Sequence, residues 1–457
     1  MIKYILIKKH CTSLTIVVLI LASILFAACE ENDSEGGAIA ISKVFLEDVN
    51  SSVPDRQVNF GRLGQLLRIE GYGFAGLKKA YINGYPTYFN PVYVTDNSML
   101  ISISADTPTV DADESVRNTI RLANDTNEVI FSFEIRSSAP TITSISNTLP
   151  NPGEEITVYG TGLIEVNKVV FPGNIAVTNG ISYDEEDGEF FMVTVPEGVS
   201  ENGGSLFIES ANGGAYSPSY FNFKKGVILD FDGNGVHGFW DAGNSMIKDV
   251  DIESTSIGVG NVSQGIYAPH RPSRIASFAA ATNRNSEVWT AGNDVDNWRS
   301  QITPFIAAST PLDQVAFQFD IYVPEPWANT GYLQILLINN FNGGEWSGGA
   351  YNYVPWIVDG KVKAFQTNGW TTVTVPFTEF YNFSDGEYTF EDLLAYREGA
   401  TYKNFGIFFN NSDIKLSDIT GGSSEVEFAS AATSVNVYTD NWRIVSLEVP
   451  TTTDFPE

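Results

Sequence analysis

Apolar and polar residues alternate along most of the chain, and this period of two predicts β-strands. Phe317, Phe319 and Ile321 show the pattern clearly, because they share one face of a strand that Pro324 ends. A helical period is visible only in residues 390–396. We therefore expect an all-β protein. The clearest strand predictions in the C-terminal half cover residues 315–323, 332–338, 373–375, 405–409 and 435–445.

Two segments of the N-terminal half repeat each other without gaps at an offset of 89 residues. In each copy an alternating apolar strand leads into a Gly-x-Gly turn, and a further glycine follows the next strand. Glycine suits such turns because it adopts positive φ readily. The repeat predicts two similar small domains in tandem. The matched glycines are Gly64, Gly71, Gly73 and Gly84 in the first copy and Gly153, Gly160, Gly162 and Gly173 in the second.

The second copy, with Pro140 before it and Val195 and Pro196 after it, resembles the TIG type of immunoglobulin-like domain. The resemblance covers residues 138–225 well and residues 39–137 less well, because the first copy has a longer second half. It implies two β-sandwiches that act as spacers or interaction modules. Whether they touch a ligand or only space it stays open.

The start of the chain has the pattern of an export signal. Lys3, Lys8 and Lys9 precede an apolar stretch over residues 14–26. This stretch has 13 residues, whereas a membrane-spanning helix needs about 20. A basic start before a short apolar stretch is typical of a secretory signal that is removed from the mature protein.

Two alanines and Cys29 follow the apolar stretch, and this ending resembles a bacterial lipoprotein signal. The resemblance implies that residues 1–28 are removed and that Cys29 is acylated. Residues 29–38 then form an acidic linker, similar to the export signal of Bacteroidetes surface lipoproteins. The implied location is the outer membrane, through a lipid anchor, with the protein facing the cell exterior. An ordinary secretory signal is the alternative.

Composition narrows the partners further. The chain has 55 Asp+Glu and 26 Lys+Arg, a formal charge of −29, so nucleic acid is excluded as a partner because its phosphates require basic residues. Cys29 is the only cysteine beyond the signal, which excludes an intrachain disulfide and a cysteine metal site. His237 and His270 are the only histidines there. We predict no cofactor and no metal requirement.

All eight tryptophans lie in residues 226–450. A β-sandwich uses one or two of them as core anchors, so eight predict an aromatic binding surface. The tryptophans are Trp240, Trp289, Trp298, Trp327, Trp346, Trp356, Trp370 and Trp442.

Four motifs of the same region, in residues 227–233, 319–324, 369–376 and 437–443, resemble strands of carbohydrate-binding jelly rolls. Together with the lipoprotein signal and the TIG-like repeats, they make the whole chain similar to the surface glycan-binding protein B type of Bacteroidetes polysaccharide utilisation loci. This resemblance implies a protein without catalytic activity that holds a neutral plant polysaccharide or oligosaccharide near an outer-membrane glycan importer.

The expected fold is two immunoglobulin-like (TIG-type) sandwiches followed by a larger jelly-roll-like β-sandwich. The expected boundaries are 1–28 for the signal peptide, 29–38 for the linker, 39–137 and 138–225 for the immunoglobulin-like domains, 226–450 for the glycan-binding sandwich and 451–457 for the tail.

Trp and Tyr rings stack on the apolar faces of sugars, while amide and carboxylate groups bind the hydroxyls. The long loop over residues 339–355 mixes these residue types, and we expect Trp346 and Trp356 to lead a stacking platform there. Its other expected members are Tyr351, Tyr353, Asn342 and Glu345.

Three further tryptophans are expected to bind glycan. Trp289 and Trp298 flank a polar stretch and predict a surface pair, and Trp327 follows two prolines at a strand exit. Trp370 is expected to be structural. The remaining two, Trp240 and Trp442, are assigned to the core or its rim.

Three alternatives remain open. Structural calcium is conceivable near Asp230 and Asp232, or at Asp440. A protein-binding adhesin is the second alternative. A glycan-active enzyme is the third, since a glycosidase needs two carboxylates and a chain with 55 acidic residues contains many chance pairs. Among neutral glycans, flat β-linked chains suit coplanar aromatic rings, which favours β-glucans and xyloglucan.

Overall fold

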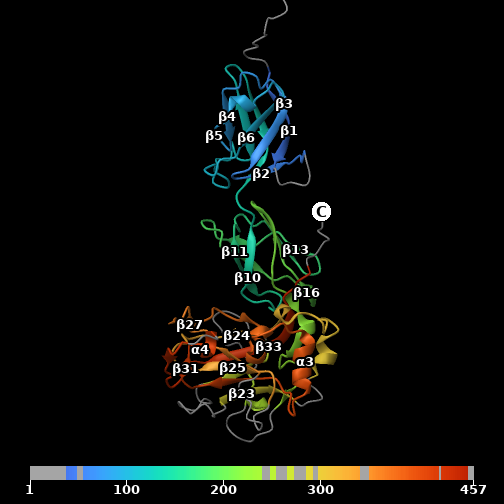
Figure 1. The fold of residues 1–457 in the computed structure, drawn as a ribbon, viewed down its shortest axis with the longest axis vertical. Coiled ribbons are helices and arrows are strands. Elements are labelled where there is room, and N and C mark those ends of the chain that lie inside the picture. The colour runs from blue at the N-terminus through green and yellow to red at the C-terminus, as the bar shows by residue number, and fades with distance from the viewer. Residues whose placement is uncertain are drawn as a thin grey trace, which may run out of the picture. The chain divides into compact units, whose positions relative to one another are not determined.

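The computed structural model describes residues 38–48, 55–238, 247–253, 265–271, 285–291, 297–339, 349–420 and 424–450. The chain divides into two compact units, residues 1–138 and 139–457. Strands in several sheets account for most of the regular structure. The predicted fold class is confirmed: two immunoglobulin-like sandwiches precede a larger β-sandwich (Figure 1).

The N-terminal unit has two antiparallel sheets, β1-β3-β6 and β5-β4-β7-β8, and a parallel pair, β2-β9. Alternate residues such as Leu67 and Ile69 face its own buried core. Its elements are β1 (Ala40–Glu47), β2 (Phe60–Arg62), β3 (Leu66–Tyr72), β4 (Lys79–Ile82), β5 (Tyr85–Thr87), η1 (Pro91–Tyr93), β6 (Ser98–Ser102), β7 (Thr119–Ala123), β8 (Glu128–Ser132) and β9 (Glu134–Arg136).

The second immunoglobulin-like domain also has two antiparallel sheets, β10-β11-β15-β14 and β13-β12-β17-β18, and its additional pair, β16-β19, is antiparallel. Its core is separate from that of the N-terminal unit. Its elements are β10 (Thr141–Ile145), β11 (Glu155–Thr161), β12 (Lys168–Phe171), β13 (Ile175–Val177), β14 (Ser182–Tyr183), β15 (Phe190–Thr194), β16 (Asn202–Gly204), β17 (Phe207–Ser210), β18 (Gly213–Tyr216) and β19 (Phe221–Phe223).

The repeated glycines occupy equivalent backbone positions. A Cβ on Gly71 would lie 1.9 Å from the carbonyl oxygen of Ala40, and one on Gly160 would lie 1.9 Å from that of Thr141. Both glycines therefore allow the first two long strands of each sandwich to approach closely. Positive φ angles occur at the other matched glycines, Gly64, Gly73 and Gly84 and Gly153, Gly162 and Gly173.

The C-terminal sandwich packs two five-stranded sheets face to face. The back sheet is β20-β33-β24-β29 with β22 paired to β33, and the front sheet is β21-β23-β30-β25-β26. Figure 1 shows β24 and β33 in one layer and β25 and β23 in the other. Phe317 of the back sheet and Ile335 of the front sheet are fully buried in the core between them.

The strands of this sandwich are β20 (Val227–Leu229), β21 (His237–Gly238), β22 (Ala268–His270), β23 (Asn285–Thr290), β24 (Val315–Tyr322), β25 (Tyr332–Leu336), β26 (Ala350–Tyr353), β29 (Thr371–Pro376), β30 (Gly406–Asn410) and β33 (Val437–Ser446). Short hairpins are formed by β27 (Ile357–Val358) with β28 (Lys361–Val362) and by β31 (Ile414–Lys415) with β32 (Glu427–Phe428). The helices are α2 (Trp298–Ile302), α3 (Phe390–Glu398) and α4 (Ser417–Thr420), and the 3-10 turns are η2 (Lys224–Gly226), η3 (Asp249–Asp251), η5 (Leu312–Gln314), η7 (Phe377–Glu379) and η8 (Tyr381–Phe383).

The strands predicted from alternation are present as β24, β25, β29, β30 and β33. The short predicted helix is α3, which begins at the expected residue and has Thr389 and Asp392 as its capping box. No helix within the described residues is long and apolar enough to cross a membrane.

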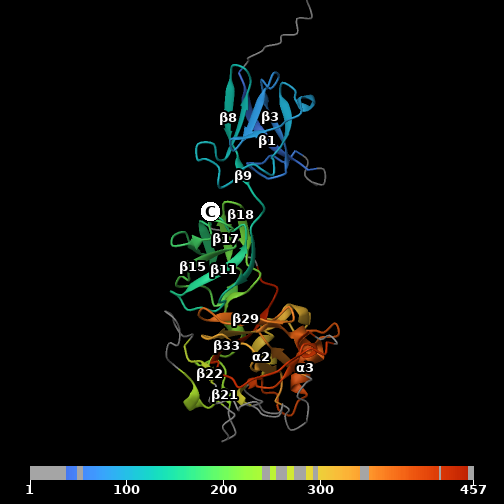
Figure 2. The same cartoon turned by 90° about the vertical axis from the view of Figure 1, so that its left-hand side faces the viewer.

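The outer face of the back sheet is covered in part by the second immunoglobulin-like domain. The backbone N–H of Thr372 donates to the carbonyl of Ser146 at 2.9 Å, and that of Thr148 donates to the Thr372 hydroxyl at 2.9 Å. Arg443 donates to the Thr148 hydroxyl at 2.9 Å. Figure 2 shows β29 and β33 on the side of the sandwich toward β11. Because this face is engaged, the outer face of the front sheet is the broad sheet surface that the second immunoglobulin-like domain leaves uncovered.

Candidate glycan-binding site

The outer face of the front sheet is defined by the residues that alternate with its core residues. Val288, Ile335 and Ile407 point into the core between the sheets. Side chains alternate between the two faces of a strand, so Trp289 and Phe408 point outward. Both belong to a small apolar cluster apart from the main core.

One row across this face is apolar. Strand register places Leu336 between Ala350 and Gly406, and places Gly406 beside Trp289. A Cβ on Gly406 would lie 2.2 Å from the Trp289 ring. The missing side chain of Gly406 therefore makes room for the indole on the sheet.

The next row carries amides. Asn352, Gln334 and Phe408 are neighbours on β26, β25 and β30. The Asn410 amide donates to Gln334 Oε1 at 3.3 Å, and the Ser412 hydroxyl donates to Asn410 Oδ1 at 2.8 Å. Amide side chains are suited to bind sugar hydroxyls because they offer both donors and acceptors.

Asn352 is the member of this row nearest the sheet edge, since β26 is an edge strand. Its side-chain oxygen accepts no hydrogen bond within the described residues. A buried acceptor without a partner costs about 1–3 kcal/mol. The amide nitrogen of the same side chain donates to the carbonyl of Asp418 at 3.5 Å.

The expected loop platform connects the two strands that carry these rows. The backbone N–H of Leu337 donates to the carbonyl of Gly349 at 2.8 Å, which closes the connection at its base. Trp346, Asn342 and Glu345 fall within residues 340–348 and lie outside the described residues. The connection leaves β25 after Leu336 and enters β26 at Ala350, which are paired with each other.

Tyr351 and Tyr353 do not join the outer face. They alternate with Asn352 on β26 and point into the core, where their ring centroids lie 5.9 Å from Phe380 and 5.7 Å from Phe319 respectively. Burial raises the pKa of Tyr351 to about 12 and also raises the pKa of Tyr353. Both rings serve packing here, contrary to the expectation that they would stack on sugar.

Trp356 and Trp327 are core anchors in the structure. Their side chains are 1% and 0% exposed. The indole N–H of Trp356 donates to the carbonyl of Gly331 at 2.9 Å, and that of Trp327 donates to the carbonyl of Thr330 at 2.7 Å. A buried ring with a satisfied N–H presents no face to a ligand, so neither residue belongs to an exposed platform.

Trp289 and Trp298 do not form the expected surface pair. Trp289 is on the outer face, with its indole N–H 2.8 Å from Glu287 Oε2, and Trp298 is in the main core. The Arg397 guanidinium lies 3.5 Å from the centroid of the Trp298 ring. The two rings are 0% and 1% exposed. Both rings serve packing, Trp298 in the main core and Trp289 with Leu336 and Phe408.

The remaining tryptophans fall largely where the sequence assigned them. Trp370 is 9% exposed and packs with Tyr267 and Tyr322 on the outer side of the back sheet. Trp442 is in the main core. Trp240 lies outside the described residues.

The amide row was not anticipated from the sequence. Residues 332–338 are nearly continuously apolar, which predicts a central strand and gives no weight to the polar side chain of Gln334. The available signal was the isolated polar position within that run, in register with Asn352 on the next strand. Two amides at paired positions of neighbouring strands are a pattern that indicates an outward polar row.

The acidic residues considered for calcium have hydrogen-bond or burial explanations in the structure. Asp230 Oδ1 accepts from the backbone N–H groups of Asp232 and Asn234 at 3.0 and 2.8 Å, which stabilises a turn. Burial raises the pKa of Asp440 well above its ordinary value, and the nearby Asp320 carboxylate adds to this effect. Among the described residues, no group of three or more His, Cys, Asp or Glu side chains could hold a metal ion.

The C-terminal sandwich matches a known protein family. Residues 221–446 match the model of the family described as surface glycan-binding protein B xyloglucan binding domain. A curated relative from Bacteroides ovatus, an IPT/TIG domain-containing protein, is 24% identical over 321 residues. That match covers 70% of this chain and 55% of the relative, so the chain spans about half of the relative's length.

Among solved structures, the surface glycan-binding protein PbSGBP-B from Prevotella bryantii has a similar fold. Its TM-score is 0.58 at 18% sequence identity, and the match covers 91% of this chain and 100% of that chain. At this identity the likeness shows a shared fold.

Proposed function

Because residues 221–446 belong to the surface glycan-binding protein B xyloglucan-binding family, we propose that the protein holds a neutral plant polysaccharide at the cell surface without cleaving it. The family is one of binding proteins, and the observation that carries the proposal is the coincidence of the family match with the whole C-terminal sandwich.

The outer face of the front sheet is the proposed binding surface. Gln334 and Asn352 of its amide row are partly exposed and offer donors and acceptors to sugar hydroxyls, whereas Trp289 and Leu336 of its apolar row are buried and pack the sheet. The connection between β25 and β26 contains Asn342, Glu345 and Trp346. Trp346 is the proposed stacking residue, with Asn342 and Glu345 as hydroxyl binders.

The proposed ligand is a β-linked neutral glucan, with xyloglucan first. The family description names xyloglucan. The amides of Gln334 and Asn352 are uncharged, and uncharged hydrogen-bonding groups match a neutral sugar better than an ionic one.

The proposed location is the outer surface of the outer membrane, through acylation of Cys29, and the proposed partner is a glycan importer complex in the same membrane. The basic, apolar and small residues that precede Cys29 support this location. Cys29→Ala is expected to move the protein from the membrane fraction to the soluble fraction. Equal membrane partitioning of the variant and the wild type would contradict the lipid anchor.

The glycan proposal is tested by affinity electrophoresis of the soluble chain from residue 30 onward, in gels that contain xyloglucan, mixed-linkage β-glucan, mannan or xylan. We expect retardation in xyloglucan or β-glucan and no release of reducing sugar from either. Unretarded migration in all four gels would contradict glycan binding and favour a protein-binding adhesin. Release of sugar would make the protein an enzyme.

A further inference from the structure

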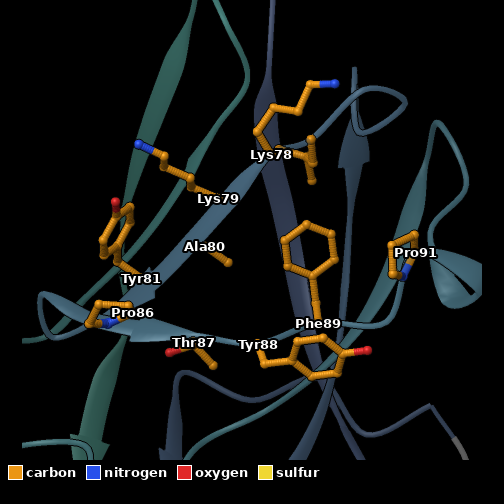
Figure 3. Close-up of a pocket in the computed structure, with 10 residues that line it drawn as sticks. Lys78, Lys79, Ala80, Tyr81, Pro86, Thr87, Tyr88, Phe89 and Pro91 are labelled. Atoms are coloured by element: carbon orange, nitrogen blue, oxygen red, sulfur yellow. The ribbon is translucent and has the colours of Figure 1, made fainter.

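The N-terminal unit has a groove that the proposed function does not use. It lies between β4 and the chain that follows β5 and has a volume of about 570 Å³. Figure 3 shows Tyr88 and Phe89 close together on one side, with Lys78 and Lys79 across from them. Tyr81, Pro86 and Pro91 complete the apolar lining.

The apolar side chains at this groove are exposed to an unusual degree. Tyr88 is 81% exposed, and the neighbouring Val92 and Tyr93 are 82% and 58% exposed. Tyr88 lines the groove, and Val92 and Tyr93 follow it in the sequence within six positions; exposed apolar side chains that gather in this way mark binding surfaces. Folding of the unit does not explain them, because its core is built from other residues.

The groove is held in place by local packing and hydrogen bonds. Phe89 packs against the core of the unit. Asn90 accepts from the backbone N–H of Val92 at 3.1 Å and, through its carbonyl, from that of Tyr93 at 3.0 Å. The guanidinium of Arg121 lies 4.0 Å from the centroid of the Tyr81 ring. These contacts fix Phe89, Tyr81 and the backbone turn at Asn90 before any ligand arrives, which lowers the entropic cost of binding.

The only charged side chains among the lining residues are two lysines. Lys78 Nζ is 4.0 Å from Asp125, a distant and exposed pair, and Lys79 forms no ion pair within the described residues. Residues 38–138 contain 9 Lys+Arg and 12 Asp+Glu, whereas residues 139–457 contain 14 and 39. The groove is therefore a locally positive site in the less acidic part of a strongly acidic chain. Charges beyond about 8 Å are screened at physiological salt, so the local lysines dominate.

We propose that this groove is a second glycan site, which binds a saccharide chain bearing carboxylates, such as a chain of uronic acids. Exposed aromatic faces suit the apolar faces of pyranose rings, and the lysines suit a carboxylate on the sugar. The site differs in charge from the neutral surface proposed on the C-terminal sandwich.

A peptide fits the groove less well. Strand β5 is an edge of its sheet, and an edge strand binds an extended peptide through backbone hydrogen bonds. Pro86 is the middle residue of this three-residue strand and has no N–H to donate. A ligand in the groove would therefore contact side chains rather than form a series of hydrogen bonds with the backbone of β5.

The test measures binding of a defined galacturonate oligosaccharide to the chain from residue 30 onward by calorimetry, with a neutral xyloglucan oligosaccharide measured in parallel. We expect Tyr88→Ala and Lys79→Gln each to weaken galacturonate binding at least tenfold and to leave xyloglucan binding unchanged. Galacturonate binding should also weaken as salt increases, because charged groups are screened.

Tyr72→Ala is the matched control, because Tyr72 is a 55% exposed tyrosine of the same unit outside the groove lining. It should bind galacturonate as the wild type does. No galacturonate binding by the wild type, or equal binding by wild type and both groove variants, would overturn the inference. Loss of xyloglucan binding in Tyr88→Ala would assign the groove to the neutral ligand and would also overturn it. Failure of wild-type xyloglucan binding would count against the proposed function alone.

Discussion

The guanidinium of Arg443 donates a hydrogen bond of 2.9 Å to the hydroxyl of Thr148, although 295 positions separate the two residues. Arg443 lies on the last strand of the C-terminal sandwich, and Thr148 belongs to the second immunoglobulin-like domain. The same guanidinium nitrogen is 2.9 Å from Asp320 Oδ1, and the two charged side chains are 1% and 0% exposed. A buried ion pair is favourable only when its remaining hydrogen bonds are satisfied. The hydroxyls of Thr148 and Thr372 contribute to this.

Removing one partner of this pair is expected to be costly. Arg443→Ala should lower the free energy of unfolding by about 3–5 kcal/mol, because Asp320 is left buried without its cation. Thr148→Val should cost about 1 kcal/mol through the lost hydrogen bond. Urea denaturation measures both. Arg299→Ala is the control, since its pairs with Glu391 and Glu398 are exposed and should cost less than about 1 kcal/mol. Similar losses in Arg443→Ala and Arg299→Ala would show that the buried pair has no special role.

Because Trp356 and Trp327 are buried, replacing either ring should destabilise the C-terminal sandwich. Each alanine variant should lose about 3–5 kcal/mol of stability, because a large buried ring is replaced by a cavity. The measurement is the urea midpoint of the C-terminal sandwich. Tyr381→Ala, at a 70% exposed ring, should shift that midpoint little. If Trp356→Ala were as stable as Tyr381→Ala yet defective in glycan binding, the ring would have to be exposed in solution.

Gly406 is expected to tolerate no side chain while Trp289 occupies its place. Gly406→Ala should destabilise the sandwich by about 1–3 kcal/mol, because overpacking forces the indole or the strand to shift. The double variant Gly406→Ala/Trp289→Leu should recover part of this loss, and thermal unfolding measures both. At Gly399 the nearest atom to an added Cβ is 3.3 Å away, against 2.2 Å at Gly406, so Gly399→Ala should cost less and is the control. A fully stable Gly406→Ala would contradict the packing of Trp289 on this strand.

The proposed binding surface makes a separate prediction. Trp346→Ala should weaken xyloglucan binding by about 2 kcal/mol, roughly thirtyfold, as expected for a stacking hot spot. Asn352→Ala should weaken it by about 1 kcal/mol, since one hydrogen bond is lost. Both variants should unfold near the wild-type midpoint, and calorimetric titration gives the affinities. Unchanged affinity in both would remove the front sheet and its connection from the site.

The free energy of unfolding should decrease as the pH falls, because of His270. This side chain is fully buried, and its Nδ1 is 2.9 Å from the carbonyl of Ser286. That carbonyl only accepts, so Nδ1 carries the proton of the neutral ring, and Nε2 accepts from the Thr439 hydroxyl 3.2 Å away. Burial lowers the pKa of His270 from 6.5 to about 4. Between these pKa values the unfolded chain binds the proton and the folded chain does not.

This part of the stability is therefore complete above pH 6.5 and is lost as the pH falls to about 4, a change on the order of 3 kcal/mol. Asp440 has a raised pKa and contributes with the opposite sign, so the wild type must be compared with His270→Gln. The variant should show a smaller loss of unfolding free energy between pH 7 and pH 4.5 in urea titrations. Parallel pH curves for the two proteins would exclude His270 as the source.

Local pattern was sufficient for much of the fold. Alternation in residues such as Phe317 and Phe319 predicted β24, and the repeated glycines predicted two related sandwiches. These inferences succeed because backbone conformation and strand facing depend on neighbouring residues. The same rule of alternation shows that Tyr351 and Tyr353 share one face of β26. It assigns that face to the core only once the neighbouring strands of the sheet are known.

The site was harder to predict because tryptophan has two uses. Trp289, Trp298, Trp327 and Trp356 lie in polar or irregular sequence, which suggested exposed rings. In the structure these rings are covered by contacts from distant segments, such as the carbonyl of Gly331 for Trp356. Residue type alone does not separate a stacking ring from a core anchor. The paired amides Gln334 and Asn352 were missed because their relation depends on strand register.

The buried junction around Arg443 also has a mechanical consequence. A long polymer bound to the sandwich exerts torque as it moves. A flexible linker between the two domains would not transmit this torque. Here the second immunoglobulin-like domain and the sandwich share a desolvated ion pair and its hydroxyl partners, so residues 139–450 should rotate in solution as a single body. A fluorescent label on the second immunoglobulin-like domain would then report the slow rotational correlation time of both domains together, and the torque of the polymer would pass to that domain undiminished.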